Sequence, residues 1–223
     1  MDENLKEHTV KSYDKDLKSI AGTIDDLVGL AVHSINIVEE LINTPGADFI
    51  DRIKKHDYKI NSLDHLVEKK VTAMLALRQP MAFDLRYIVS ALKVSANLER
   101  IGDKAKSVVK KIHYINNLVI DDEIKDSLLK MLTIAKDMIK ASVAAFNGSD
   151  AKKAEKVLKE DDKIDQIYND LFVLIDHDKF SRQQVKLMIN ILFIAKAIER
   201  IADHTTNIAE ITQYVISGEI ADN

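Results

Sequence analysis

The chain has 223 residues, a formal net charge of −4 and no cysteine, so disulfides, thiolate catalysis and cysteine-ligated metal sites are excluded. Acidic and basic residues are interspersed, and no basic surface for nucleic acid is indicated. The N-terminus, Met1-Asp2-Glu3-Asn4, has no apolar signal-like stretch, and no segment approaches the roughly 18 uninterrupted apolar residues of a membrane span. We therefore expect a soluble, cytoplasmic protein.

Helical periodicity begins near the N-terminus, where apolar residues recur at spacings of three and four. The pattern predicts a first helix over roughly 9–43, ended by Asn43-Thr44-Pro45-Gly46. A second helix is predicted from Phe49 to about Leu77. Gln79-Pro80 interrupts the periodicity, because proline ends one helix and can begin the next. The third helix is predicted from about Met81 to Tyr114.

The segment 116–120 reads as a joint between two halves of the chain. A fourth helix is predicted from the acidic residues at 121–123 to Asn147-Gly148, and Ser149-Asp150 can cap a fifth helix that runs to about Asp176. Ser181-Arg182-Gln183-Gln184 fits a capping box that opens a sixth helix, ending near Ser217. The sequence thus predicts three helices, a joint and three helices.

The two halves also resemble each other in sequence. Leu92–Asp103 reads LKVSANLERIGD and Leu192–Asp203 reads LFIAKAIERIAD, with five identities at an offset of 100. The preceding helices match more loosely, at Asp57–Asn61 and Asp161–Asp165. An internal duplication explains this. We predict an all-α fold of two tandem, pseudo-repeated three-helix bundles, with six long up-down helices and domains at 1–116 and 117–223.

Each half carries one Glu-x-x-x-Asp pair, whose carboxylates lie on one helix face because they are four residues apart. The pairs are Glu99 with Asp103, and Glu199 with Asp203. Such a pair alone is more often a solvated helix face than a site. Here, however, each Glu lies within about 40° of three apolar residues on the helical wheel, which predicts that the carboxylates continue a buried face. These apolar residues are Leu85, Ile88 and Leu92 for the first pair, and Val185, Met188 and Leu192 for the second.

The neighbouring helices supply further acidic residues that a hairpin would bring level with these pairs. Asp57 and Glu99 are equidistant from residue 78, and Asp161 and Glu199 are equidistant from residue 180. Antiparallel hairpins that close at these residues place the members of each pair side by side. The sequence therefore predicts one site between the second and third helices and another between the fifth and sixth.

Several carboxylates beside apolar faces favour a bound cation, because they cannot all stay ionised together without compensation. Their oxygen donors suit Mg, Ca or Mn, and iron is compatible with a multi-carboxylate cluster, so a divalent or trivalent metal ion is expected. Partial pairing with Arg100, Arg200 and nearby lysines is the alternative. His204 lies about 140° from Glu199 and is not expected to be a ligand. The candidate metal ligands are Asp57, Asn61, Asp64, Glu99 and Asp103 in the first half, and Asp161, Asp165, Glu199, Asp203 and Asn207 in the second.

Two segments carry a resemblance to a known family. QPMAFDLRYIVSALKVSANLERIGD at 79–103 and AIERIADHTTNIAE at 197–210 resemble the PhoU family of phosphate-uptake regulators. The resemblance implies two three-helix bundles, a homodimer and metal bound at the Glu-x-x-x-Asp motifs. It also implies a regulator without chemistry, which restrains a phosphate ABC transporter, acting with its ATPase subunit, and assists the sensor histidine kinase of the phosphate regulon. A membrane would be reached only through these partners.

The repeats depart from each other at two motif positions. Lys104 corresponds to His204, and Asn61 corresponds to Asp165. These differences leave ion identity and occupancy of the first site open.

Two other function classes compete with the regulatory reading. A carboxylate-bridged di-metal oxidase in a helical bundle would use Glu-x-x-His motifs, and no Glu in this chain has His three residues later. A passive coiled-coil tether would need sustained heptads, whereas Pro45, Pro80 and Gly148 break the chain into hairpins.

Overall fold

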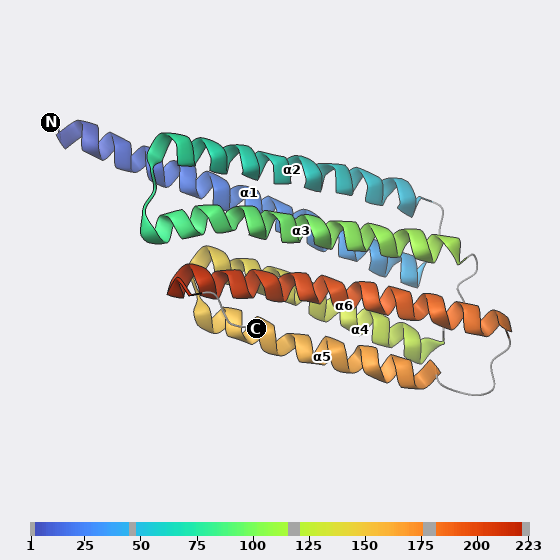
Figure 1. The fold of residues 1–223 in the computed structure, drawn as a ribbon. Helices are drawn as coiled ribbons and strands as arrows, with labels where there is room; N and C mark the ends of the chain where they lie inside the picture. The colour runs from blue at the N-terminus through green and yellow to red at the C-terminus, as the bar shows by residue number, and fades with distance from the viewer. Residues whose placement is uncertain (1–2, 45–47, 116–120, 176–181, 220–223) are drawn as a thin grey trace.

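The computed structural model of the chain describes residues 3–44, 48–115, 121–175 and 182–219, and within these ranges it contains six helices and no strand (Figure 1). The predicted joint, Pro45-Gly46 and Ser181 lie outside the described residues. The helices are α1 (Glu3–Asn43), α2 (Phe49–Arg78), α3 (Ala82–Tyr114), α4 (Asp122–Gly148), α5 (Ala151–Ile175) and α6 (Arg182–Ser217). The predicted all-α fold is confirmed, although α1 begins at Glu3 rather than near residue 9.

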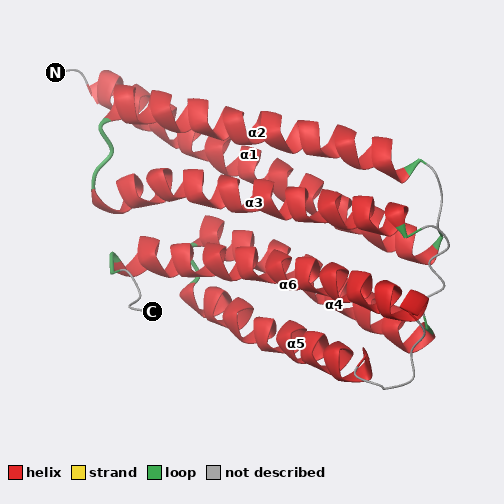
Figure 2. Ribbon diagram, turned by 45° about the vertical axis from the view of Figure 1, so that its right-hand side comes forward, coloured by secondary structure: helices red, strands yellow, loops and turns green. Residues whose placement is uncertain are grey.

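The six helices form two three-helix bundles that lie side by side (Figures 1 and 2). One bundle contains α1, α2 and α3, the other contains α4, α5 and α6, and successive helices run in opposite directions. The bundles meet where α3 packs against α6 and α1 packs against α4. Because α3 and α6 are antiparallel, the repeat in sequence becomes an approximate two-fold rotation in space.

Local residue chemistry sets several of the helix ends. Gln79 adopts a left-handed conformation with φ 47°, and Met81 is extended, so the chain reverses around Pro80. A side-chain oxygen of Asp121 accepts a hydrogen bond from the Glu123 backbone N at 3.0 Å. Asp150 accepts one from the Lys153 backbone N at 3.0 Å, as the predicted start of α5 requires.

The buried residues form one hydrophobic core that draws on all six helices. Contacts between the bundles include the stacked rings of Tyr87 on α3 and Phe146 on α4, whose centroids are 4.7 Å apart. The guanidinium of Arg86 also donates from Nε to the backbone oxygen of Val215 on α6 at 3.0 Å. The halves are therefore repeats in sequence that share one core.

One described segment, Ser12–Asn43 of α1, is long and apolar enough by composition to cross a membrane. Its apolar positions, such as Ile24, Leu27, Ile35 and Val38, are fully buried in the first bundle. The hydropathy of α1 is thus accounted for by its place in the core.

Candidate metal centres

The register between paired helices differs from the prediction by about one helical turn. In the first half Asp57 lies opposite Asp103, because both carboxylates bind the ammonium of Lys106. The same register places Asn61 opposite Glu99. The reversal is centred on Pro80 instead of residue 78, since Gln79 and Met81 are not helical. The prediction that Asp57 lies opposite Glu99 is therefore wrong, while the predicted antiparallel pairing of α2 and α3 is confirmed.

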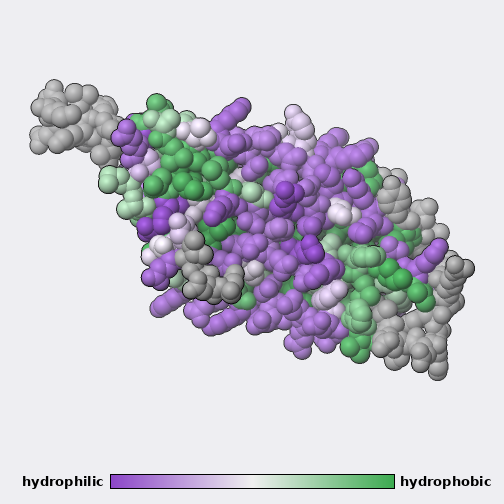
Figure 3. All heavy atoms as spheres, viewed as in Figure 1, coloured by the Kyte–Doolittle hydropathy of each residue, from purple (hydrophilic) through white to green (hydrophobic). Residues whose placement is uncertain are grey.

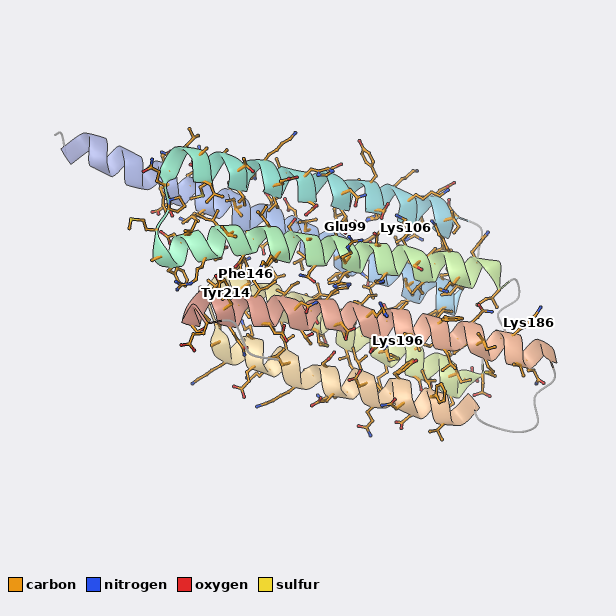
Figure 4. All side chains as sticks on the ribbon, in the orientation of Figure 1. Glu99, Lys106, Phe146, Lys186, Lys196 and Tyr214 are labelled. Atoms are coloured by element: carbon orange, nitrogen blue, oxygen red, sulfur yellow. The ribbon has the colours of Figure 1, made fainter. Side chains whose placement is uncertain are left out.

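The first cluster comprises Asp57, Asn61 and Asp64 on α2 together with Glu99 and Asp103 on α3. Its charge is partly neutralised by Lys106, whose Nζ lies 2.7 Å from Asp57 Oδ2 and 3.1 Å from Asp103 Oδ1. Figure 4 shows Glu99 and Lys106 along the side of α3 that faces α2. Burial opposes the charge on Lys106, yet these hydrogen bonds raise its pKa on balance. A lysine therefore supplies part of the positive charge that a metal would provide.

Two further contacts hold the acids of this cluster. Asp64 accepts a hydrogen bond from the Ser95 hydroxyl on α3. Arg100 approaches Glu99 at 3.6 Å and Asp103 at 3.9 Å, from an exposed position. Burial, followed by repulsion from Asp103, raises the pKa of Glu99 above its ordinary value. The pairing with Arg100 and lysine that the sequence left as an alternative is thus present in the first cluster.

The second cluster also contains four carboxylates. Asp161 and Asp165 on α5 meet Glu199 and Asp203 on α6, and Asp165 stands where the first cluster has Asn61. Burial, together with repulsion from Asp165, Asp203 and Glu199, raises the pKa of Asp161 to about 6. Burial also raises the pKa values of Asp165 and Asp203. The arrangement stores unfavourable electrostatic energy that a cation would relieve.

A lysine approaches the second cluster as well, but from the edge. Lys196 lies on α6, on the side toward α5 (Figure 4), and its Nζ is 2.5 Å from Glu199 Oε1. The other oxygen of Glu199 is buried without a hydrogen-bond partner, and the same holds for Asp161 Oδ1. Glu199 is only 8% exposed. Buried carboxylate oxygens without a donor are costly, so a cation bound by Asp161 and Glu199 would relieve this cost.

The described residues do not form a ready-made metal cage, because no group of three or more His, Asp or Glu side chains among them converges in that way. The donor set nevertheless fits a hard cation, since all its donors are oxygens and Asn61 Oδ1 is also buried without a partner. Asp161, Asp165, Glu199 and Asp203 would hold a cation in the second cluster. The cation would supply charge neutralisation there.

The structure places some predicted residues differently. Leu85 and Val185, expected on a buried face, are 40% and 43% exposed, whereas Ile88 is buried. The apolar stripe is wider than the contact with the neighbouring helices, so its outer edge faces solvent. Asn207 turns toward the first bundle and donates from Nδ2 to Asn97 Oδ1 at 3.4 Å.

Sequence reasoning missed a polar contact between the bundles. His204 Nδ1 lies 3.0 Å from Asn97 Oδ1, across the boundary between α6 and α3. Burial and the nearby charges of Lys104, Arg100 and Arg200 lower the pKa of His204. Its position off the carboxylate face agrees with the helical wheel. Asn97 lies among other polar residues of its helix, such as Lys93 and Ser95, so no local pattern identified it as the partner of His204.

Comparison with known proteins gives a consistent result for both halves. The family model described as "PhoU domain" matches residues 24–112 and again residues 128–212. The chain is 32% identical over 216 residues to a protein of Caulobacter vibrioides named "Phosphate-specific transport system accessory protein PhoU homolog", covering 96% of this chain and 94% of that protein. A protein of the same name from Clostridium acetobutylicum is 32% identical over 219 residues, which cover 96% and 98% of the two chains.

Solved structures show the same fold. The crystal structure of PhoU from Pseudomonas aeruginosa aligns with a TM-score of 0.82 at 25% identity, covering 93% of this chain and all of that one. The phosphate transport system regulatory protein PhoU from Streptococcus pneumoniae aligns with a TM-score of 0.83 at 24% identity and 95% coverage of this chain. The second likeness concerns the fold alone.

Proposed function

This chain belongs to the PhoU family, and we propose that it serves a phosphate-specific transport system as a regulatory accessory protein without chemistry of its own. The observation that carries the proposal is the similarity over nearly the whole length of both bundles to proteins with that printed name. Fold alone would not support a function. The carboxylate clusters supply negative charge and oxygen donors, which is consistent with a binding role.

We infer that the chain works in the cytoplasm as a homodimer that limits phosphate uptake. Its proposed partners are the ATPase subunit of a phosphate ABC transporter and the sensor histidine kinase of the phosphate regulon. The long helical surface offers room for both, and the net charge of −4 gives no support for binding nucleic acid. Contact with the membrane would run through these partners.

Deletion of the gene tests the regulatory role. In phosphate-rich medium the deletion strain is expected to take up more phosphate and to express the starvation response. The complementing gene should restore both to the parental level. Unchanged uptake together with unchanged repression would sink the proposal.

We also propose that the second cluster binds a metal ion and that the first binds one more weakly. In the second cluster, Asp161 and Glu199 each have a buried oxygen without a hydrogen-bond partner, which supports a bound cation. In the first cluster, Lys106 already pairs with Asp57, which supports weaker binding. Mg, Ca, Mn and iron all remain candidates on ligand type. Bound metal would fix α5 against α6.

Metal analysis of protein purified without chelator tests the second cluster. Glu199→Gln/Asp203→Asn removes two negative charges, and the metal content is expected to fall. The matched control is Glu155→Gln/Asp170→Asn, which removes two charges from exposed positions of α5. Equal metal content in the double variant and the control would show that the assignment is wrong. Metal-dependent oxidation of ferrous iron by the wild type would instead favour a di-metal oxidase.

A further inference from the structure

Two groups of exposed apolar side chains lie on α3 and α6, beside the carboxylate clusters. The first apolar patch consists of Met81, Leu85 and Val89, and the second consists of Val185, Ile189 and Phe193. Leu85 and Val89 are four apart on α3, and Val185, Ile189 and Phe193 are four apart on α6, so each set lies on one helix face, while Met81 precedes α3 in an extended conformation. All six side chains are between 40% and 80% exposed. Exposed apolar clusters of this kind mark interaction surfaces more often than isolated exposed residues do.

The two patches occupy equivalent positions in the repeat. Leu85 corresponds to Val185, and Val89 to Ile189, at the same offset of 100. Since α3 and α6 are antiparallel neighbours, this equivalence places the patches at opposite ends of one face (Figure 1). Figure 3 shows two hydrophobic areas on that face, one over the start of α3 and one over the first part of α6. The approximate two-fold axis passes between them.

A hydrophilic band separates the two areas (Figure 3). Exposed Arg100 and Arg200, again equivalent in the repeat, contribute to the polar surface of the helices between the patches. A single continuous interface has an apolar centre and a polar rim, whereas this face has a polar centre and an apolar patch at each end. Each patch is therefore the centre of a separate contact. Two contacts related by a two-fold rotation match a partner that has the same symmetry.

We propose that the face formed by α3 and α6 docks across the two-fold axis of a homodimeric protein assembly, with one apolar patch on each identical subunit. A face-to-face second copy would place the charged bands against each other at the interface centre, where charge is normally depleted. An anionic membrane would be repelled by Asp103 and Asp203 and by the net charge of −4. The inference rests on the proposed function, because the partner used in its test is the phosphate ABC transporter. That transporter has two ATPase subunits.

The experiment uses the full chain and the detergent-solubilised transporter. Val89→Asp and Ile189→Asp each charge one patch, and the double variant charges both. The matched control is Leu66→Asp, which charges a 38% exposed leucine on α2, outside both patches. Thermal melts by circular dichroism verify that every variant is folded. Affinity is measured by interferometry and stoichiometry by mass photometry.

One wild-type homodimer is expected to bind per transporter, through the α3–α6 face of one of its two chains. Each single variant should lose about 10²-fold or more in affinity, because the second contact no longer adds its effective concentration. At high concentration a single variant should bind as two homodimers per transporter, one for each ATPase subunit. The double variant should not bind, and Leu66→Asp should change affinity by less than about threefold.

Four results would overturn the proposal: two wild-type homodimers per transporter, a loss below about threefold in either single variant, a solution dimer of this chain that the patch variants split, or patch-dependent binding to phosphatidylglycerol vesicles. Transporter binding that persists unchanged in the patch variants would refute the docking face and leave the regulatory function standing. Absence of any wild-type binding would count against both.

Discussion

At the scale of single residues, Lys106 distinguishes the two clusters most clearly. It bridges Asp57 and Asp103, while the equivalent position in the second half is Thr206. Asn61 also stands where the second cluster has the acid Asp165, although Asp64 brings the first cluster to the same number of carboxylates. A buried carboxylate accepts either a lysine or a metal ion as its counter-charge. The first half therefore carries a built-in competitor for the metal.

Replacing that competitor should make the first cluster dependent on metal. Lys106→Met keeps the length of the side chain but leaves Asp57 and Asp103 without their donor, so the chelated protein should lose about 1–3 kcal/mol of unfolding free energy. Added Mg²⁺ or Ca²⁺ should then raise the melting temperature more than in the wild type. Lys110→Gln, an exposed control one turn further along α3, should behave as the wild type. An equal metal response in Lys106→Met and Lys110→Gln would contradict the competition.

A second residue-scale prediction concerns His56, which stacks on His33 with ring centroids 4.3 Å apart. Burial, then the charges of His33, Lys59 and Arg52, lower the pKa of His56 below its ordinary value. The unfolded chain therefore binds a proton that the folded chain resists, and stability falls as the pH drops through about 6.5. His56→Phe keeps a stacked ring and should remove this loss, which solvent screening limits to less than about 1 kcal/mol. Urea unfolding at pH 7.5 and 5.5 measures it, and parallel profiles for the two proteins would refute the prediction.

At the scale of helices, α2 and α3 approach closely at Gly102. A Cβ atom at this position would lie 2.6 Å from Cδ1 of Ile60 on α2. The second half has Ala202 at the equivalent position, so its helices have adjusted to the extra methyl group. The close approach helps bring α2 acids within reach of α3 acids. It is a property of the pair of helices and not of either one alone.

A double-mutant cycle measures this contact. Gly102→Ala gains about 0.5–1 kcal/mol from helix propensity but loses about 1–3 kcal/mol from overpacking against Ile60, so it should be neutral or destabilising. In an Ile60→Val background, which lacks Cδ1, the same substitution should become stabilising. Gly29→Ala, where no atom lies within 4 Å of the new Cβ, should stabilise in either background. Identical effects of Gly102→Ala in both backgrounds would show that Ile60 does not limit the approach.

The helices themselves could be predicted from the sequence, because periodicity and breakers such as Pro80 and Gly148 act locally. The candidate site residues could be named for the same reason, since Glu-x-x-x-Asp defines one helix face, and their role in binding metal stays a prediction. What failed depends on two helices at once. The conformations of Gln79 and Met81 set the register that places Asp57 opposite Asp103. The exposure of Leu85 depends on its distance from the neighbouring helices. The contact of His204 with Asn97 joins the two bundles, which no local pattern specifies.

At the scale of the whole molecule, the two repeats should unfold together. Buried residues of all six helices form one core, and α3 packs directly on α6, so either half alone would expose an apolar face. Tyr87 is well placed to test this, because its ring stacks on Phe146 and its hydroxyl donates to Asn147 Oδ1 at 3.2 Å. Calorimetry of the chelated protein should show one transition, with equal van't Hoff and calorimetric enthalpies.

Tyr87→Ala removes a large, partly buried ring between the bundles and should cost about 1–3 kcal/mol of unfolding free energy. If the two bundles fold cooperatively, this loss of stability also affects helices that Tyr87 does not contact. Native-state hydrogen exchange, read by mass spectrometry, should therefore show α5 peptides of the second bundle losing as much protection as α2 peptides of the first. Loss confined to peptides from α1, α2 and α3 would mean that the repeats unfold independently. The chain would then be two joined domains, and a metal bound in the second cluster could not stabilise the first bundle.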